Sequence, residues 1–372
     1  MNLEPNEEQR MLADTVTRYL AQSYPFEDRL TRAKDGFDRT LWHDFAELGL
    51  LGVALPESIG GYGGGMQDAA IVAEAMGGAL CVQPFIEGAV VAGEILARCQ
   101  VEKAKHVSRE MVAGERLICV LEEGRSNLVA ESSGGDLRLS GTARLAAWAP
   151  VANNLLLPAM LDGQSAILMV ETDTPGITVR SYRLIDGRPA ADLSFDCLCA
   201  LDAVLLTGAA AREALAAAYD HGTAAVCGHA VGLMRRMIAD TRVYLLDREQ
   251  FGSPLAGFQA LQHRFVDMFM EAEQADAAAL LAALACDEDP TKDGCDRARA
   301  VSAAKIVTNR ALRYISQNAV QLHGAMGMTE ELPVGHFFRR AAAIELEFGQ
   351  SDAHVRRYNS AWTSAQRPAQ AA

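Results

Sequence analysis

A long, alanine-rich helical pattern in the C-terminal half most limits the folds open to this chain. Apolar residues recur there every three or four positions, and they are Phe258, Leu261, Phe265, Met268, Ala272, Ala275 and Ala279. This spacing places them on one face of a long helix. A second long helix is predicted from 295 to 322. Because long helices with small alanine side chains pack closely, the pattern predicts a four-helix bundle over 208–365.

The N-terminal part also has helical spacing, whereas the middle of the chain does not. Short apolar or alternating runs follow one another in the middle, separated by turn sequences such as Pro175-Gly176. Short strands at this spacing predict a small β-barrel or sandwich. The chain is therefore expected to be mainly α with a β insert. The predicted parts are an N-terminal helical domain at 1–116, a middle β domain at 117–207, the bundle at 208–365 and a flexible tail at 366–372.

Composition excludes several classes of function. The net charge of −14, without a cluster of Lys or Arg, would repel a nucleic acid. None of the 8 cysteines forms a Cys-x-x-Cys pair, and Cys197 and Cys199 lack the further ligands of a metal site. Such cysteines are typical of buried thiols in a reducing compartment. The acidic N-terminus and the absence of an apolar run of ~18 residues predict a cytoplasmic protein without a membrane span.

Two segments carry candidate binding chemistry, and the first runs from Asp247 to His263. The guanidinium of Arg248 matches a pair of pyrophosphate oxygens and stays charged when it is desolvated. Phe251 offers an aromatic surface beside it. Gln259 opens the following predicted helix, where free backbone N–H groups can meet a phosphate.

The second segment has the pattern Gln-x-x-Gly-x-x-Gly at Gln321, Gly324 and Gly327. Glycine permits a close approach of the backbone, either to a cofactor or to a neighbouring helix. Each of the two patterns is weak evidence alone. Their occurrence together, in this order and in this helical context, is much more specific.

Together the two segments resemble the flavin-binding signatures of the acyl-CoA dehydrogenase family. The resemblance extends to 48–63 and to Pro333 with Arg339-Arg340, so it touches nearly the whole chain. It implies the three-part fold of that family, FAD as cofactor, an acyl-CoA thioester as substrate and an electron-transfer flavoprotein as acceptor. It also implies that a set of residues contacts the FAD of a neighbouring subunit, namely Arg248, Gln250, Phe251, Gln259, Gln321, Gly324 and Gly327.

The resemblance fails at the catalytic base. Members of the family remove the weakly acidic α-proton of the thioester with a desolvated glutamate while a β-hydride passes to the flavin. Counted from Arg340, the usual position of that glutamate is Gly349 here. Some members place it on the first helix of the bundle, at the position of Gly222, and the arginine beside it is Thr223 in this chain.

Two nearby acids remain weak candidates for a relocated base. A register shift of one or two residues would bring Glu347 or Asp352 to the site. Solvated charges at helix ends are the commoner explanation of such residues. The catalytic residues are therefore unknown from the sequence.

The middle domain departs from the family as well. The family's Thr-Glu-Pro-x-x-Gly-Ser loop corresponds to 121–126, which is shorter and unlike it. The Trp-Ile-Thr strand beside the flavin ring is replaced by Leu145-Ala146-Ala147, with Trp148 close by.

Three hypotheses follow from these matches and losses. The preferred one is a base-lacking partner of a catalytic subunit, similar to the small subunits of heteromeric dehydrogenases for pimeloyl-CoA or steroid side chains. The second is a homodimeric acyl-CoA dehydrogenase whose base has moved to Glu347 or Asp352. The third is a flavin-free scaffold or acyl-CoA-binding homologue, which would not need the segments around Arg248 and Gln321.

Overall fold

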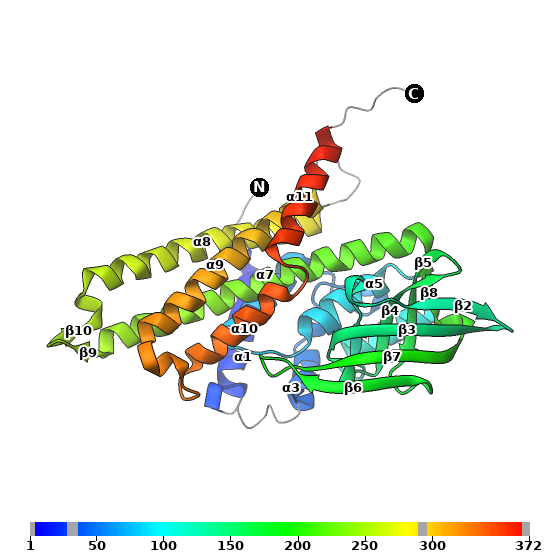
Figure 1. Cartoon of the computed structure of the whole chain (residues 1–372), viewed down its shortest axis with the longest axis horizontal. Helices are drawn as coiled ribbons and strands as arrows, with labels where there is room; N and C mark the ends of the chain where they lie inside the picture. Colours follow the sequence, from blue (N-terminus) through cyan, green and yellow to red (C-terminus); the bar gives the residue numbers. More distant parts are fainter. Residues whose placement is uncertain (1–3, 28–35, 289–295, 367–372) are drawn as a thin grey trace. The chain divides into compact units, whose positions relative to one another are not determined.

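The computed structural model describes residues 4–27, 36–288 and 296–366, and these form two compact units (Figure 1). The helical unit draws on Met1–Arg29, Met66–Val82 and Thr223–Ala372. The sheet unit draws on Leu30–Gly65 and Gln83–Gly222. The predicted division into three domains and a tail stays a prediction. Beyond Gln366, the predicted tail lies outside the described residues, as does Cys295.

The sheet unit consists of short helices and one β-sheet. Its α-helices are α3 (Arg39–Glu47), α5 (Ala92–Ala97) and α6 (Glu102–Val112). A π-helix, Phe85–Val91, leads into α5. The strands are β1 (Ile118–Val120), β2 (Val129–Ser133), β3 (Asp136–Ala147), β4 (Asn154–Leu161), β5 (Gln164–Glu171), β6 (Ile177–Arg183), β7 (Pro189–Ala200) and β8 (Val204–Thr207).

The strands follow the order β6-β7-β3-β2-β4-β5-β8, with β1 paired parallel to β4. Alternation predicts the buried face correctly, since Leu193, Phe195, Cys197 and Cys199 of β7 are buried and the residues between them are exposed. Within the described residues the sheet is open, with β6 and β8 at its ends, whereas the sequence predicted a barrel or sandwich. Strand spacing does not predict closure, because closure depends on whether the two end strands pair.

The helical unit contains the predicted long helices. Its helices are α1 (Glu7–Ser23), α4 (Met66–Gly78), α7 (Gly208–Asp247, in this unit from Thr223), α8 (Gln259–Asp287), α9 (Arg297–His323), α10 (Pro333–Leu346) and α11 (Ser351–Gln366). A two-residue hairpin, β9 (Glu249–Gln250) and β10 (Ser253–Pro254), joins α7 to α8. The chain is thus helical, then β, then helical, as the sequence predicts. No described helix has the length and apolar character that crossing a membrane requires.

Local sequence determines where these helices start and which face they bury. The Asn6 side chain accepts from the Gln9 N–H, and the Gln9 side chain bonds the Asn6 N–H, which forms a capping box at the start of α1. On α8 the predicted apolar face is buried at Met268, Ala272 and Ala275. Towards the start of α8 the same face is only half-buried.

Glycines bring α4 and α7 into very close contact within the helical unit. A Cβ on Gly232 would overlap the carbonyl oxygen of Glu74, and a Cβ on Gly77 would overlap the carbonyl oxygen of His229. At Gly228 a Cβ would lie 2.9 Å from the carbonyl oxygen of Ala70. In each case the neighbouring atom is backbone, which cannot move aside as a flexible side chain would. The close approach therefore requires glycine at these positions.

We expect Gly232→Ala to lower the free energy of unfolding by about 2–3 kcal/mol, because the added methyl group forces α4 and α7 apart. Gly78→Ala is the matched control, since a Cβ there lies 3.7 Å from its nearest neighbour, the Gly232 carbonyl oxygen. Urea denaturation of the two variants measures the difference. Equal stability of the two variants would contradict this account of the crossing.

Candidate cofactor-binding site

The hairpin that follows α7 has the geometry of a tight two-residue turn. Gln250 pairs with Ser253, and Phe251 and Gly252 between them have φ angles of 56° and 79°. Positive φ at both central residues is typical of a type I′ turn. Glycine adopts this conformation freely, but a phenylalanine there is strained by about 1–3 kcal/mol. Strain of this kind is often found at functional positions.

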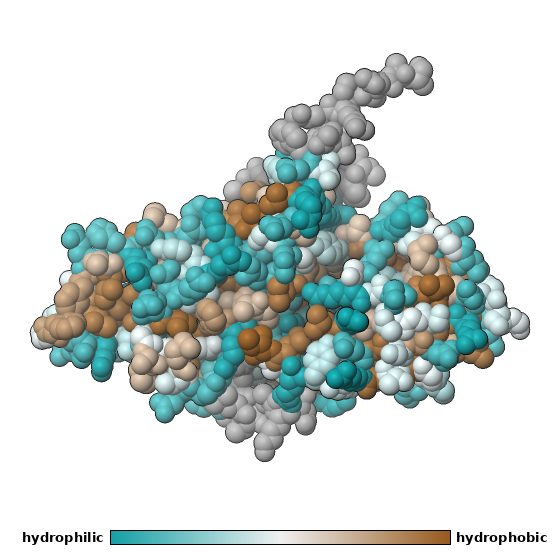
Figure 2. Space-filling view, in the orientation of Figure 1, coloured by the Kyte–Doolittle hydropathy of each residue, from teal (hydrophilic) through white to brown (hydrophobic). Residues whose placement is uncertain are grey.

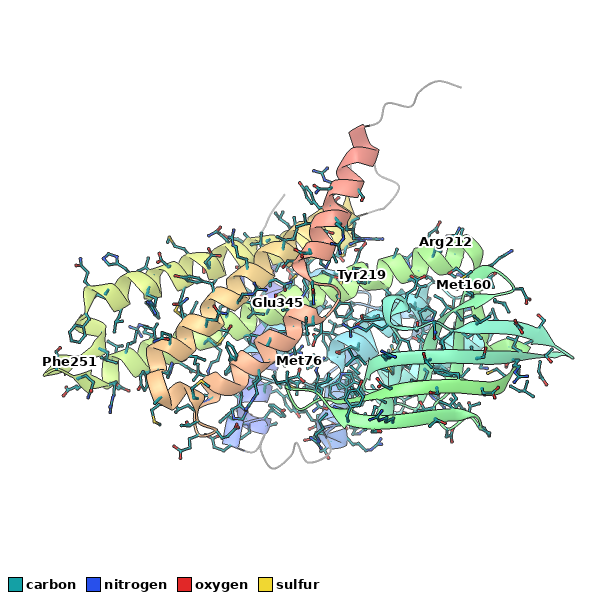
Figure 3. The ribbon with its side chains drawn as sticks, viewed as in Figure 1. Met76, Met160, Arg212, Tyr219, Phe251 and Glu345 are labelled. Atoms are coloured by element: carbon teal, nitrogen blue, oxygen red, sulfur yellow. The ribbon has the colours of Figure 1, made fainter. Side chains whose placement is uncertain are left out.

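The strained turn holds an aromatic side chain in solvent. Phe251 is 92% exposed and lies at the tip of the hairpin (Figure 3). Its ring contacts Phe258 edge to face, with 6.1 Å between the ring centroids. Apolar surface gathers at this end, where Figure 1 labels β9 and β10 (Figure 2). Met328, 78% exposed, and Met326 add further exposed apolar side chains to the helical unit.

Positively polarised groups lie beside this tip. The Arg248 N–H donates to the Tyr244 carbonyl at 2.9 Å, which extends α7 to the hairpin. The Arg248 side chain is exposed and has no ion-pair or hydrogen-bond partner among the described residues. Phe258 caps the start of α8 without a side-chain hydrogen bond, and Gln259 is exposed on the first turn. A guanidinium and an open helix N-terminus together fit an anionic group such as a pyrophosphate.

The second sequence segment, which begins at Gln321, lies at the same end of the helical unit as the hairpin. Gln321 is exposed on the last turn of α9, and Gly324 ends the helix with φ 60° and ψ −139°, a conformation almost restricted to glycine. A Cβ on Gly324 would meet nothing within 4 Å, which leaves its backbone open to approach by a ligand. Gly327 differs, because a Cβ there would lie 2.8 Å from the Val320 carbonyl oxygen. Its glycine is therefore required by packing within the chain.

A tyrosine and a histidine join the two segments. The rings of Tyr244 and His323 stack with centroids 4.4 Å apart and an interplanar angle of 27°. The Tyr244 hydroxyl also donates to the His323 carbonyl at 3.1 Å. Tyr244 lies one helical turn before Arg248, and His323 immediately precedes Gly324. The structure thus brings together the two patterns that the sequence separates by about seventy residues.

Known proteins match the chain over nearly its whole length. The N-terminal domain model of acyl-CoA dehydrogenases matches residues 6–115, and the C-terminal domain model matches residues 212–361. The chain belongs to the acyl-CoA dehydrogenase family. Acyl-CoA dehydrogenase FadE27 of Mycobacterium tuberculosis is 28% identical over 344 residues, which cover 88% of this chain and 89% of the relative.

Two solved structures with a similar fold are each named after two different proteins. A chain of the ChsE4-ChsE5 complex from Mycobacterium tuberculosis superposes with a TM-score of 0.90 at 26% identity, covering 99% of this chain and 100% of that one. A chain from a variant of the Tcur3481-Tcur3483 steroid acyl-CoA dehydrogenase gives a TM-score of 0.86 at 26% identity, covering 96% and 98%. This chain is accordingly an FAD-dependent acyl-CoA dehydrogenase homologue.

The loop between α10 and α11 contains Gly349, the position at which the sequence predicts the base of the family. Phe348 and Gly349 have φ angles of 49° and 92°, and neither carries a carboxylate. At a φ of 92° any residue with a side chain is strained. Glycine at 349 is therefore a requirement of this loop's backbone.

Three side chains fix this loop from within the helical unit. The buried Lys305 ammonium donates to the Ile344 carbonyl at 2.7 Å, at the C-terminal end of α10. His354 contacts the Phe348 carbonyl through Nε2 at 2.7 Å, and since a carbonyl only accepts, Nε2 carries the proton. The Asn309 amide donates to the Ser351 hydroxyl at 3.3 Å. The loop is thus held at its start, middle and end.

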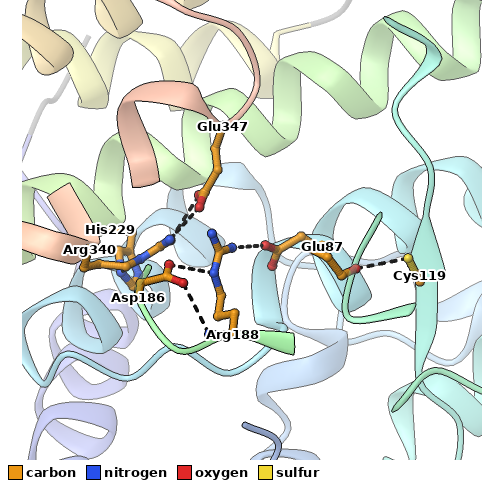
Figure 4. Close-up of polar contacts among 8 residues, drawn as sticks. Glu87, Cys119, Asp186, Arg188, His229, Arg340 and Glu347 are labelled. Atoms are coloured by element: carbon orange, nitrogen blue, oxygen red, sulfur yellow. Dashed lines mark hydrogen bonds and ion pairs between the residues drawn. The ribbon is translucent and has the colours of Figure 1, made fainter. Parts of the chain in front are cut away.

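Glu347, one of the two candidate acids, lies in this loop and is bound by an arginine. Both of its oxygens accept from the Arg340 guanidinium, at 2.5 and 3.1 Å (Figure 4). Arg340 is 4% exposed and also donates through Nε to the His229 ring at 3.3 Å. A carboxylate held bidentately by a buried guanidinium is stabilised as the anion, and its lone pairs are occupied. This geometry suits a structural ion pair better than a base for a carbon acid.

The other candidate positions lack a poised carboxylate in the described residues. Asp352 is exposed on the first turn of α11. Gly222 and Thr223 are buried on α7.

The strand that replaces Trp-Ile-Thr is irregular in the sheet unit. The pairing of β3 with β7 shifts in register between Ala143 and Ala146, and Leu145 between them has a φ of 54°. Trp148 also has a positive φ, 71°, and is completely buried. A bulge re-aims the side chains beyond it. The segment that departs from the family in sequence therefore also has an irregular backbone.

The sequence alone did not point to Tyr244, and it did not distinguish His323 from the other residues of the second segment. Burial lowers the pKa of His323, and this effect exceeds the opposing influences of the Ala319 carbonyl and of Asp240. His323 lies in the segment from Gln321 to Glu331, but nothing in its position distinguishes it from other residues at the end of a helix. Tyr244 carried no sequence signal, because a stacking contact between helices depends on how they cross.

We expect Gly349→Glu to lower the free energy of unfolding by about 1–2 kcal/mol, because the new side chain is strained at a positive φ. Gly257→Glu is the control, since Gly257 has no positive φ and a Cβ there meets nothing within 4 Å. Thermal and urea unfolding compare the two. A stability loss no greater than that of the control would show that position 349 accepts a side chain freely.

Proposed function

We propose that this chain is the base-lacking subunit of a heteromeric acyl-CoA dehydrogenase. It supplies contacts to the pyrophosphate of an FAD whose ring lies in a catalytic partner subunit. The observation that carries this proposal is the combination of two features in the helical unit. One end presents unpartnered groups suited to a pyrophosphate around Arg248, whereas the loop at Gly349 has no base.

The residues proposed to contact the partner's FAD are those predicted from the sequence, with one reassignment. Arg248, Gln259 and the open N-terminus of α8 would meet the pyrophosphate. Phe251 and Gln250 on the hairpin, with Gln321 and the backbone at Gly324, would border it. We assign Gly327 to packing within this chain, because its Cβ position is occupied by the Val320 carbonyl. FAD, when bound, supplies the acceptor for the β-hydride of the substrate.

The exposed tip supports a contact with another chain. Phe251 is strained and almost fully exposed, and the only aromatic contact of its ring among the described residues is with Phe258. Exposed aromatic anchors are typical of residues that become buried on association. The similarity to complexes of ChsE4 with ChsE5 and of Tcur3481 with Tcur3483 favours an unlike partner over a second copy.

The substrate class, the electron acceptor and the location of the protein are also proposed. A bulky acyl-CoA, such as a steroid side-chain thioester, is favoured because one solved relative is a steroid acyl-CoA dehydrogenase. An electron-transfer flavoprotein is proposed as the electron acceptor, since the family resemblance implies it. We place the protein in the cytoplasm, which agrees with the free, buried thiols of the described cysteines.

Arg248→Ala is expected to weaken FAD binding by the assembled enzyme by about 1.5–3 kcal/mol, roughly tenfold to hundredfold, through loss of a charge-assisted hydrogen bond. The chain is co-expressed with a catalytic acyl-CoA dehydrogenase subunit that forms a complex with it, and FAD affinity is measured by flavin fluorescence. Arg242→Ala, an exposed arginine six residues earlier on α7, is the control and should change affinity less than about twofold. The complex should hold about one FAD per pair of unlike chains. One FAD on every chain, or equal effects of the two variants, would contradict the assignment.

Glu347→Gln distinguishes a base-lacking subunit from a homodimer with a relocated base. Loss of a general base slows turnover by about 10²–10⁴-fold, whereas loss of a structural ion pair should leave the turnover of the complex within about threefold. Asp352→Asn is the companion variant. Turnover by the purified chain alone that either substitution abolishes would support the homodimer instead. A colourless complex without flavin would support the scaffold hypothesis.

A further inference from the structure

Tyr244 and His323 connect the two segments through direct contacts. The Tyr244 carbonyl accepts the Arg248 N–H at 2.9 Å, and its hydroxyl donates to the His323 carbonyl at 3.1 Å. The stacked rings add a second contact between the same two residues, with centroids 4.4 Å apart. His323 is followed directly by Gly324, where the chain turns out of α9. A displacement of either residue would therefore move one segment relative to the other.

Hydrogen bonding determines where His323 takes up a proton. Its Nδ1 lies 2.8 Å from the Ala319 carbonyl, which only accepts, so Nδ1 carries the hydrogen of the neutral ring. Nε2 is then the only site for a second proton. The ring is buried, so the charged form loses solvation, and burial lowers the pKa of His323.

The charged and titratable groups around the ring come mainly from α7. Asp240 attracts the protonated form, and one of its oxygens is held by Arg236 at 2.8 Å. Its other oxygen, Oδ2, is buried and has no hydrogen-bond partner among the described residues. Tyr244 faces the ring from the same helix, and Ala319 faces it from α9. The residues that follow, Gly324–Met328, carry no charge.

We propose that Tyr244 and His323 are a positioning pair, which fixes the spacing between the Arg248 segment and the Gln321 segment, and that proton uptake by His323 loosens this spacing and weakens FAD binding. The inference rests on the proposed function only in its last step, the effect on FAD. The first step concerns this chain alone.

The direction of the pH effect follows from linkage. A buried neutral histidine has a folded-state pKa below its unfolded value, so the native contact is fully present above about pH 6.5. As the pH falls below that value, conformations that expose His323 gain a proton that the stacked form excludes. The contact therefore weakens in acid.

Hydrogen exchange of the isolated chain tests the positioning step. Tyr244→Phe keeps the ring and removes only the hydroxyl, so the fold should be retained. We expect amide exchange in 248–258 and 321–331 to rise several-fold together, with the middle of α8 unchanged. Tyr314→Phe, the same substitution on an earlier turn of α9, is the control and should leave both segments unchanged. Unchanged exchange in Tyr244→Phe, or a rise in one segment only, would overturn the positioning pair.

The pH profile of FAD affinity, measured on the co-expressed complex, tests the protonation step. The dissociation constant should rise between pH 7.5 and pH 5.5, by at most about tenfold per pH unit for a single proton. His323→Gln should flatten this profile, whereas His106→Gln, an exposed histidine on α6 of the sheet unit, should leave it as in the wild type. An unflattened profile in His323→Gln would refute the protonation step.

The failures are distinguishable. If Arg248→Ala leaves FAD affinity unchanged while Tyr244→Phe raises exchange in both segments, the proposed FAD contacts fail and the positioning pair stands. If Arg248→Ala weakens binding and Tyr244→Phe changes neither exchange nor affinity, the FAD contacts stand and the positioning pair fails.

Discussion

The helical unit depends on the close crossing of α4 and α7. Backbone carbonyls of one helix occupy the space in which side chains of the other would begin, at Gly77 and Gly232. Such a contact has one arrangement, because neither partner can adjust by changing a rotamer. The crossing also seats His229, whose ring accepts from Arg340. One constraint therefore sets the course of α7 and the position of the arginine that binds Glu347.

Arg235 reinforces the same crossing from the surface. Its guanidinium pairs with Glu74 of α4 and, at 2.8 Å, with Asp276 of α8. Burial raises the pKa of Glu74 although the arginine opposes this effect. Because this arginine is about half exposed, its pairs stabilise little by themselves and serve mainly to align three helices. Alignment matters here, since the ends of α7 and α8 carry the hairpin and the open helix N-terminus.

The sequence predicted the helices because these depend on local patterns. The three- and four-residue spacing of α8 and the Asn6 capping box are properties of neighbouring residues. The Arg-x-x-Phe-Gly pattern was informative because a tight turn needs glycine at 252. The open sheet was not predictable, since it depends on pairing between distant strands. The Tyr244–His323 stack was missed for the same reason.

Gly349 and Gly327 show how far a glycine can be interpreted from sequence. From the sequence alone, Gly327 could be a cofactor contact or a packing contact, and Gly349 marked the position expected for the catalytic base. The structure separates them by physical cause. Gly327 is excluded from carrying a side chain by the Val320 carbonyl, and Gly349 by its own φ.

The region around Arg248 and the loop at Gly349 differ in how they are held within this chain. The end that would hold a pyrophosphate keeps an exposed arginine, an uncapped helix and a strained phenylalanine, all of which are unfavourable or unused in the isolated chain. Such features persist only if a partner or ligand compensates for them. The loop at Gly349, by contrast, is held within the chain by the hydrogen bonds of Lys305 and His354. The region around Arg248 therefore needs a ligand or a partner from outside the chain, whereas the loop at Gly349 does not. This difference is what the proposed pairing with an unlike, catalytic subunit requires.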